Sequence, residues 1–335
     1  MNSFTTSTTP LTSAVCSRHI LLTVIIGLTF AVRPATAKNL ILTFRQQGKD
    51  FEDAYRGLKS ELRHECEFKE HIIDKNCSVK EVTTLMNDLQ PKLVVLMDNT
   101  SIALYRKYQE SLGENDPVVP SVAIMGVMVK KALHHLRNAS GISYEIPIVT
   151  SLVSLRAVLE TKLKKVGVVH REFLEDFIAE NRTYCKNEGI DIINISLPNK
   201  SRNFSKLLKK SLDDLDKKGI DALWVPNDNA LLDPVTIKNA WIPAARKFKI
   251  PVVVGVEVLV NPKLNFGTFA VLPDHISLGS QVAEMVYEIM ENNWKIEELH
   301  VEPPLAVYKI INLPQAKKYF HVSDEQLESV DKKLK

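Results

Sequence analysis

The sequence predicts an α/β protein made of two doubly wound, Rossmann-like lobes of parallel sheet, joined by a multi-strand hinge. Two observations lead to this prediction. Short continuous apolar runs alternate with amphipathic segments of helical period from residue 39 to residue 255, and this pattern is typical of parallel sheets covered by helices on both faces. The alternation also restarts part-way, and two lobes of about 100 residues fit the usual size of domains better than one very wide sheet.

The first series of elements occupies residues 39–124. Five apolar residues between Phe51 and Leu62 recur at helical spacing, which predicts an amphipathic helix over 50–65. Ser78 is expected to cap the next helix, with Glu81 three residues later completing a capping box. A third helix begins at Asn99 or Thr100. The strands of this series are expected at 39–44, 68–74, 93–97 and 118–124.

The second series repeats the pattern. Gly189 and Gly219 each follow an amphipathic segment and are expected to end a helix. Strands are predicted at 165–169, 191–197, 221–225 and 250–255, and helices at 154–163, 173–189, 204–219 and 233–248.

The C-terminal remainder is too short for a third domain. Apolar runs at 266–272 and 306–313, with a long helix at 274–292, most simply add edge elements to both lobes. The chain would then cross between the lobes more than once. We expect residues 38–148 plus 259–302 in the first lobe and 149–258 plus 303–330 in the second.

Residues 1–37 have the pattern of a secretory signal peptide. Arg18 precedes an apolar run at 20–32, and Ala35-Thr36-Ala37 follows as a small-residue cleavage site. Cleavage between Ala37 and Lys38 would release a periplasmic protein. An uncleaved anchor is the alternative, because the run is interrupted before the site, although it is shorter than the roughly 20 residues that a membrane crossing needs.

Composition and charge exclude several partners. The chain is 45% hydrophobic and 25% charged, with a formal net charge of +3 that falls to +1 when the two arginines of residues 1–37 are removed. Such a balance gives no attraction to nucleic acid or to an anionic membrane surface. No second apolar run approaches membrane-spanning length, so we expect a soluble, monomeric protein.

The cysteines leave two questions open. After cleavage Cys66, Cys77 and Cys185 remain, and Cys66 and Cys77 are spaced so that a disulfide would close a short loop, with buried thiols as the alternative. The stretch "HECEFKEH" at 64–71 contains possible metal ligands. It lacks a familiar zinc spacing, so a solvated helix end followed by a strand is the favoured interpretation and no metal is expected.

The residues that follow each strand are the candidate ligand contacts, because doubly wound sheets bind ligands at the carboxyl ends of their strands. The triplet 227–229 is the most polar exit, with a plain turn as the alternative. At His170, loop capping is the alternative to ligand contact. The predicted contacts are Gln46, Asn99, Thr100, Ser101, Met125, His170, Phe173, Asn227, Asp228, Asn229 and Glu257.

Several of these segments resemble the ABC-transporter substrate-binding proteins of the tryptophan/tyrosine-type group. "GIDALWVPNDNAL" at 219–231 is similar to the family's D-x-[aliphatic]-x-V-P-x-D-N segment. "GTFAVLPDHISLGSQVAEM" at 267–285 and "EPPLAVYKIINLPQAKKYF" at 302–320 resemble the family's return between lobes and its ending. The likeness covers most of residues 38–331 and is more specific in the C-terminal half.

The resemblance implies the type I periplasmic-binding-protein fold and an extracytoplasmic solute-binding protein of an ABC importer. The ligand would be a small molecule, such as an amino acid, and the partner an ABC permease. Asp228 would bind an ammonium group, Thr100 and Ser101 a carboxylate, and Phe173 or Tyr144 would cover an apolar side chain. The family's Asp-Pro after the fourth strand is missing from "AIMGVMV" at 123–129, which leaves the ligand in doubt.

Two other classes of function remain as alternatives. One is a periplasmic sensor of the same fold that passes ligand occupancy to a receptor or histidine kinase. The other is a periplasmic enzyme, which the sequence does not favour because it has no nucleophile elbow, P-loop or dinucleotide fingerprint. We therefore expect no catalytic residues and no cofactor.

Overall fold

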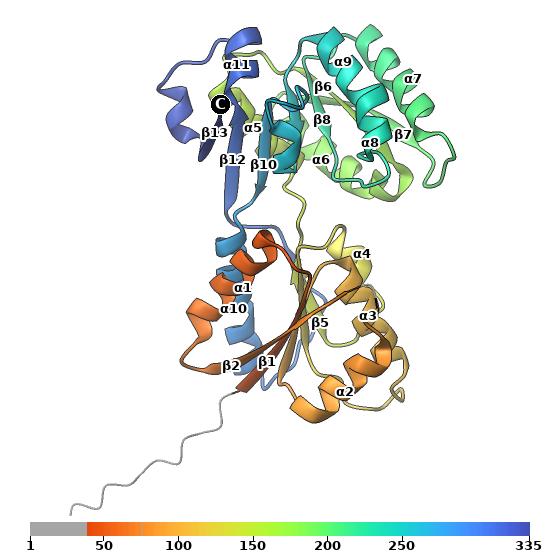
Figure 1. Ribbon diagram of the computed structural model, residues 1–335, viewed down its shortest axis with the longest axis vertical. Helices are drawn as coiled ribbons and strands as arrows, with labels where there is room; N and C mark the ends of the chain where they lie inside the picture. Colours follow the sequence, from red (N-terminus) through yellow and green to blue (C-terminus); the bar gives the residue numbers. More distant parts are fainter. Residues whose placement is uncertain (1–38, 75) are drawn as a thin grey trace, which may run out of the picture. The chain divides into compact units, whose positions relative to one another are not determined.

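The structure of the chain is a computed structural model that describes residues 39–74 and 76–335. Residues 38–335 form one compact unit, which contains two sheets (Figure 1). The predicted signal peptide and its cleavage site lie outside the described residues.

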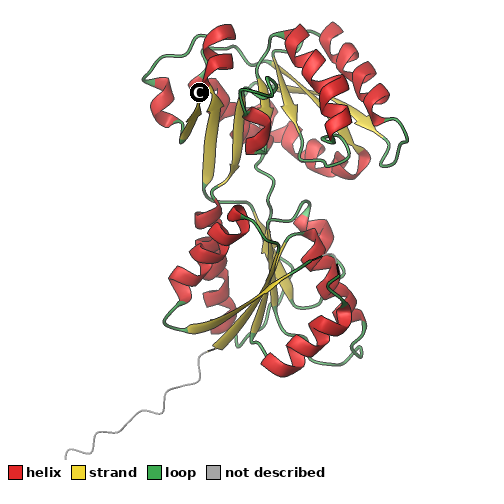
Figure 2. Cartoon of the chain, viewed as in Figure 1, coloured by secondary structure: helices red, strands yellow, loops and turns green. Residues whose placement is uncertain are grey.

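The first lobe is built on a six-stranded sheet in the order β11-β5-β4-β3-β1-β2, with every pair parallel. Its centre, β3, is fully buried because helices cover both faces (Figure 2). The strands are β1 Asn39–Arg45, β2 Cys66–Ile72, β3 Leu93–Met97, β4 Ser121–Ile124, β5 Ala139–Ile142 and β11 Val301–Glu302.

Alternate residues of β3 separate the two cores of this lobe. Leu93, Val95 and Met97 pack with α1 and α10, whereas Val94 and Leu96 pack with α2, α3 and α4. Full burial of each such side chain stabilises the fold by about 1.5–3 kcal/mol. The helices are α1 Lys49–Leu62, α2 Val79–Leu89, α3 Asn99–Glu110, α4 Val129–Leu133 and α10 His275–Glu291.

Two glycines let α1 and α10 approach each other closely. A Cβ atom on Gly279 would lie 2.0 Å from the carbonyl oxygen of Ala54, and one on Gly57 would lie 2.1 Å from that of Ile276. Any larger residue would force the helices apart. This contact fixes α10, which comes late in the sequence, in the first lobe.

The second lobe has a seven-stranded sheet in the order β13-β12-β10-β9-β8-β6-β7. All pairs are parallel except β10 with β12. The strands are β6 Lys165–Arg171, β7 Asp191–Leu197, β8 Ala222–Val225, β9 Val252–Val254, β10 Phe269–Pro273, β12 Val307–Asn312 and β13 Lys332–Leu334.

Helices cover both faces of this sheet too (Figure 2). One core contains residues of α5, α6 and α11, and the other contains residues of α7 and α9. The helices are α5 Ile148–Val158, α6 Glu175–Asn187, α7 Phe204–Lys217, α8 Pro234–Thr236, α9 Ile242–Phe248 and α11 Leu313–Tyr319, with short helical turns η1 Glu172–Leu174, η2 Ile237–Trp241, η3 Glu257–Val260 and η4 Gln326–Ser329.

The chain crosses between the two sheets three times, as the hinge prediction requires. The crossings lie between β5 and α5, between β10 and α10, and between β11 and β12. The expected assignment of 259–302 to the first lobe is wrong for β10, because this strand pairs with β9 and β12 of the second sheet. Within 259–302, α10 does pack on α1 and β11 does pair with β5.

The two doubly wound lobes were predicted correctly, but several local features were not. The elements α4, β5, β11 and β13 were not predicted, because each is short and lacks a strong period. The helix expected at 233–248 is α8, a π-helical turn and α9, because Pro243 has no N–H for the helical hydrogen bond. Glu81 does not complete a capping box, since its carboxylate contacts His71 instead.

Candidate functional site

The exit of β3 in the first lobe is organised by Asp98. Its side chain caps α3 by accepting a hydrogen bond from the N–H of Ser101 at 2.7 Å, and it also accepts one from the amide of Gln46. Asp98 is 8% exposed and has a φ of 119°. Residues other than glycine rarely adopt this backbone conformation. The sequence analysis assigned Asp98 no role.

The other predicted contacts of this lobe surround Asp98. Gln46 Nε2 lies 3.5 Å from Thr100 Oγ1, and Thr100 is exposed. Ser101 is 1% exposed, and its hydroxyl donates to the carbonyl of Asp98 at 2.8 Å. The structure therefore brings Gln46, Thr100 and Ser101 together, but Ser101 is enclosed within the helix start.

Asn99 joins this exit to the exit of β4. Its amide donates to the carbonyl of Val127 at 2.8 Å and accepts from the N–H of Val127 at 2.6 Å. Met125 lies at the start of the same loop, half-buried and with a positive φ of 58°. Through these two bonds Asn99 holds the loop in place.

The exit of β8 in the second lobe is organised by Asp228. Its carboxylate forms a two-pronged ion pair with Arg171 at the end of β6, with both nitrogen–oxygen distances at 2.7 Å. The side chain of Asp228 is fully buried and that of Arg171 is 20% exposed. Bidentate pairs of this kind are among the stronger hydrogen-bonded contacts in proteins.

Arg171 is held from three sides. Its guanidinium lies 4.7 Å from the ring centre of Phe173 and 5.8 Å from that of Phe204, so cation–π attraction adds to the ion pair. A third contact goes to the carbonyl of Asn199 at 2.7 Å. Arg171 and Asn199 were missed as site residues, although Arg171 directly follows the predicted contact His170.

The neighbours of Asp228 differ in environment. The Asn227 amide donates to the carbonyl of Gly255 at 3.3 Å, while its buried Oδ1 has no partner. Gly255 makes room for this amide, since a Cβ there would lie 2.7 Å from it. Asn229 is exposed.

His170 points into the interior of the second lobe. Its side chain is fully buried, and its ring nitrogens lie 3.0 Å from the carbonyl of Arg171 and 3.0 Å from the amide of Asn194. These bonds favour loop capping over ligand contact as the role of His170.

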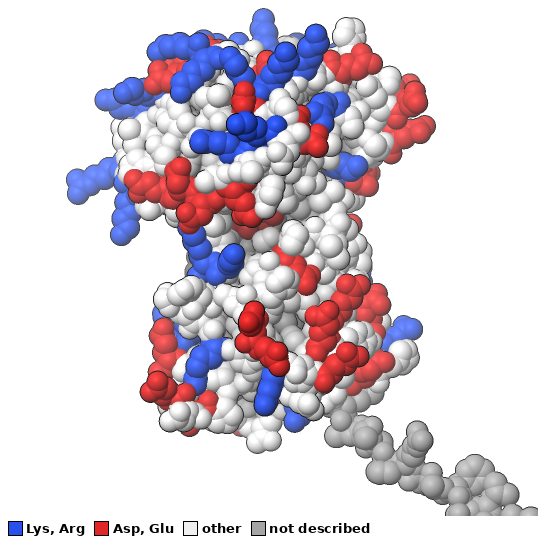
Figure 3. Space-filling view, turned by 180° about the vertical axis from the view of Figure 1, so that it is seen from behind, with Lys and Arg blue, Asp and Glu red and all other residues white. Residues whose placement is uncertain are grey.

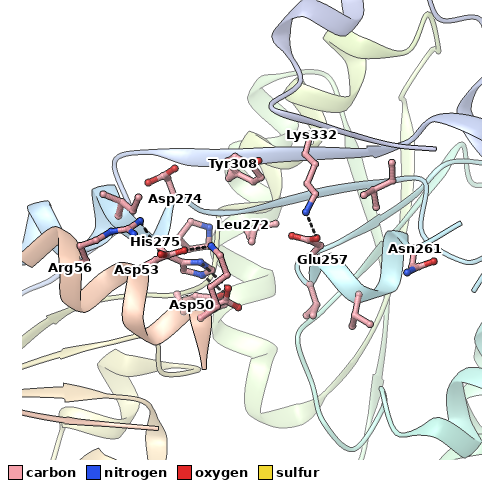
Figure 4. A pocket seen from close by; sticks show the side chains of 17 residues that line it. Asp50, Asp53, Arg56, Glu257, Asn261, Leu272, Asp274, His275, Tyr308 and Lys332 are labelled. Atoms are coloured by element: carbon pink, nitrogen blue, oxygen red, sulfur yellow. Dashed lines mark hydrogen bonds and ion pairs between the residues drawn. The ribbon is translucent and has the colours of Figure 1, made fainter. Parts of the chain in front are cut away.

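A cavity of about 730 Å³ lies where the two lobes meet at the hinge. Figure 4 shows α1 and the start of α10 on one side and Glu257, Asn261 and Lys332 on the other. Among the predicted contacts, only Glu257 lines it. The lining residues are Lys49, Asp50, Asp53, Arg56, Tyr144, Val256, Glu257, Val258, Asn261, Leu272, Pro273, Asp274, His275, Ile276, Tyr308, Lys332 and Leu334.

Ion pairs occupy much of the charged lining of this cavity. Glu257 Oε1 lies 2.6 Å from Lys332 Nζ in the second lobe, and this partner raises the pKa of Lys332. In the first lobe Asp53 is paired with Lys49 and with Arg56, at 2.5 and 3.0 Å. Asp50 is the exposed carboxylate of this wall, with 65% of its side chain accessible.

His275 and Tyr144 form the floor of the cavity beside a crossing point. Their rings stack with centroids 5.9 Å apart, and the Tyr144 hydroxyl lies 3.0 Å from His275 Nε2. Burial lowers the pKa of His275, partly offset by the charges of Asp50 and Asp274. A neutral imidazole can accept the Tyr144 hydrogen bond, and burial raises the pKa of Tyr144, which keeps that hydroxyl protonated.

A second cavity of about 700 Å³ lies between α4 and α6, and none of the predicted ligand contacts lines it. Lys131 of α4 bridges the lobes there, reaching Asp176 at 2.7 Å and the carbonyl of Phe173 at 3.0 Å. Glu145 accepts the N–H of Met128 at 2.7 Å, and burial raises its pKa.

The face drawn in Figure 3 carries charged side chains of both signs. On this face, basic and acidic side chains are interspersed on both lobes. No helix within residues 39–74 and 76–335 combines the length and apolar character that a membrane crossing requires. Cys66 and Cys77 are not joined in a disulfide.

Comparisons with known proteins identify the fold. Neither models of protein families nor curated proteins give a match. A ligand-free, open substrate-binding protein with adhesive properties from Clostridium difficile is similar, with a TM-score of 0.63 and 17% identity over 89% of this chain and 100% of that one. An ABC domain from Streptococcus pneumoniae in complex with L-Trp has a TM-score of 0.54 and 14% identity, covering 88% of this chain and 100% of that one.

A third similar structure is a periplasmic ribose ABC transporter from Conexibacter woesei, with a TM-score of 0.52 and 15% identity over 84% of this chain and 94% of that one. The chain has the type I periplasmic-binding-protein fold. At identities of 14–17%, the likeness to these three structures shows the fold alone.

Proposed function

We propose that this protein is an extracytoplasmic solute-binding protein of an ABC importer, which captures a small ligand between its two lobes. The observation that carries the proposal is the cavity of about 730 Å³ lined by both lobes beside the hinge. Its volume is within the range of about 300–1,000 Å³ typical of small-molecule sites.

The connections between the lobes support a hinged mechanism. Three crossings join the sheets, and in such proteins a few residues at the crossings absorb the change in dihedral angles when the lobes close around a ligand. Closure would bring the strand exits at Asp98 and Asp228 toward the same ligand. The predicted contacts at these exits are proposed as the second part of the site.

The lining favours a ligand with both charges, such as an amino acid. Asp50 offers an accessible carboxylate, while Lys332 and Lys49 offer cations already held by acidic partners. An ammonium group could replace Lys332 at Glu257, and a carboxylate could replace Glu257 at Lys332. At Asp228 the ligand ammonium would compete with Arg171, so we propose that Asp228 acts after closure rather than in the open form.

The partners and location follow from this function. The protein would be exported by its signal peptide, cleaved between Ala37 and Lys38, and would deliver its ligand to an ABC permease as a monomer. The lobe boundaries remain a proposal, in which β10 moves to the second lobe and that lobe extends to β13.

A ligand screen tests the proposal. Mass spectrometry of the co-purifying solutes, followed by thermal unfolding with the twenty amino acids, should identify a ligand. A ligand at 100 times its dissociation constant stabilises the folded state by about 2.7 kcal/mol, which is seen as a raised melting temperature. If no co-purifying solute and no amino acid raises the melting temperature, the proposed function is wrong.

Matched variants locate the site. Glu257→Gln should weaken binding at least tenfold in calorimetry, because the Lys332 pair is lost from the cavity wall. Glu188→Gln removes a comparable ion pair with Arg156 at 2.6 Å on the surface of the second lobe, and it should leave affinity unchanged. Equal affinities in both variants would exclude this cavity as the binding site.

A further inference from the structure

A group of possible metal ligands lies in the first lobe, away from the hinge cavity. The side chains of His71, Cys77 and Glu81 place one ring nitrogen, one sulfur and one carboxylate oxygen within 4.8 Å of one another. Among the residues that the structure describes, this is the one group of three or more such side chains so close together. None of the three lines either large cavity between the lobes.

Each of the three residues is held by a different element. His71 belongs to β2, where it is opposite Phe44 of β1, and the two rings meet edge to face at 5.7 Å. Cys77 lies in the loop between β2 and α2. Glu81 lies in the first turn of α2, whose start is fixed by Ser78 as the N-cap.

Two of the three distances between these atoms are close to those around a tetrahedral ion. His71 Nε2 lies 3.2 Å from Glu81 Oε1 and 3.5 Å from Cys77 Sγ. Ligand atoms bound to zinc at about 2.0–2.3 Å in tetrahedral geometry are separated by about 3.3–3.6 Å. An ion among the three atoms would therefore need little movement of the side chains.

The three side chains are linked in pairs, since the Glu81 carboxylate contacts both His71 and Cys77. The same nitrogen of His71 faces both the carboxylate and the sulfur, and a neutral imidazole nitrogen can either donate one hydrogen or accept one. When that nitrogen donates to Glu81, the Cys77 thiol shares the same carboxylate. A bound cation would satisfy all three ligand atoms at once.

The site is open to solvent on one side. The side chain of His71 is 22% exposed and that of Glu81 is 46% exposed, so an ion could enter and keep water as a fourth ligand. One imidazole, one thiolate and one carboxylate form a borderline-soft donor set that suits zinc rather than magnesium or calcium.

We propose that His71, Cys77 and Glu81 form a zinc site that joins the end of β2 to the first turn of α2. A metal site confined to "HECEFKEH" was disfavoured because that stretch lacks a familiar zinc spacing. Cys66 and His71 are five residues apart on one strand, so their side chains point to opposite faces of the sheet. The third ligand comes instead from Glu81, ten residues beyond that stretch.

Cobalt provides a direct test, because it replaces zinc and gives a thiolate-to-metal absorption band. Reduced, chelator-treated protein titrated with Co²⁺ should develop this band at one equivalent, and Zn²⁺ should abolish it. Burial raises the pKa of Cys77 to about 11, so binding must release a proton and the titration is best done at mildly alkaline pH. Absence of the band would overturn the proposal.

Variants assign the ligands. Cys77→Ser should remove the band, and His71→Gln and Glu81→Gln should each weaken Co²⁺ binding at least tenfold. Cys185→Ser is the matched control, because Cys185 is buried in the second lobe, and it should keep the band. A band that persists in Cys77→Ser would show that the metal binds elsewhere.

A measurement on the unmodified chain guards against variants that fail to fold. Cys77 is the half-buried thiol, whereas Cys66 and Cys185 are buried. Zn²⁺ should slow the alkylation of Cys77 at least tenfold, as read by peptide mass spectrometry, and an unchanged rate would contradict the proposal. The outcome is independent of the solute screen, so either proposal can fail alone.

Discussion

Asp98 in the first lobe and Asp228 in the second occupy corresponding places. Each follows a buried parallel strand, β3 or β8, and is at most 8% exposed. Asp98 is satisfied by neutral donors, namely the N–H of Ser101 and the amide of Gln46. Asp228 is satisfied by the charged guanidinium of Arg171, together with the N–H of Ala230.

The difference separates a structural cap from a switchable pair. The N–H of Ser101 that binds Asp98 belongs to the first turn of α3. A ligand could therefore displace this donor only by unwinding the start of the helix. Arg171 reaches Asp228 from another strand through a rotatable side chain, and a ligand cation could take its place. A polar residue at a strand exit is therefore not automatically free for a ligand.

The largest effect is expected from Asp228→Ala. The substitution leaves Arg171 mostly buried without its counter-charge, and breaking a buried pair in this way costs about 3 kcal/mol of unfolding free energy. Urea unfolding at pH 7 measures it. Asn229→Ala, at the exposed neighbour, is the control and should change stability by less than about 0.5 kcal/mol. Equal losses in the two variants would show that the pair does not stabilise the fold.

A smaller loss is expected from Asp98→Ala. Removal of a helix N-cap costs about 1 kcal/mol, and here the acceptor for Gln46 is lost as well. Asp98→Asn keeps an oxygen that can cap α3 and should retain most of the stability in the same urea assay. A loss for Asp98→Ala as large as that for Asp228→Ala would remove the distinction between the two exits.

The smallest effect concerns His275, at the hinge that joins the two lobes. Burial lowers its pKa from 6.5, so just below pH 6.5 the unfolded chain binds a proton that the folded chain does not. Its contribution to stability is complete above pH 6.5 and is lost as pH falls toward the folded pKa. His275→Gln should flatten the decrease in melting temperature between pH 7 and pH 5. An unchanged slope would contradict this origin.

Much of the fold could be predicted because its strands and helices are locally encoded. The bounds expected for β3 and the starts expected for α2 and α3 agree with the structure, since an apolar run or a capped amphipathic segment specifies each one. The division between lobes was less predictable. Nothing local to 266–272 indicates that β10 pairs antiparallel with β12 in the second sheet, because that pairing depends on how the chain returns from the first lobe.

The candidate site shows the same limit. The sequence identified Asp228 and Glu257 as polar strand exits, but it gave no sign that Arg171 and Lys332 are their partners, which lie 57 and 75 residues away along the chain. The hinge cavity was missed for the same reason, since its residues come from α1, η3, α10 and β13.

The sequence by itself determined the alternation of strands and helices, the presence of two lobes and the polar character of the strand exits, because hydrophobic period and capping residues act over a few neighbouring positions. Only the tertiary structure decided which charges are paired, which exits are enclosed and which three side chains gather at His71. Those features depend on contacts between segments far apart in the chain, and the packing of the two sheets with their helices sets them.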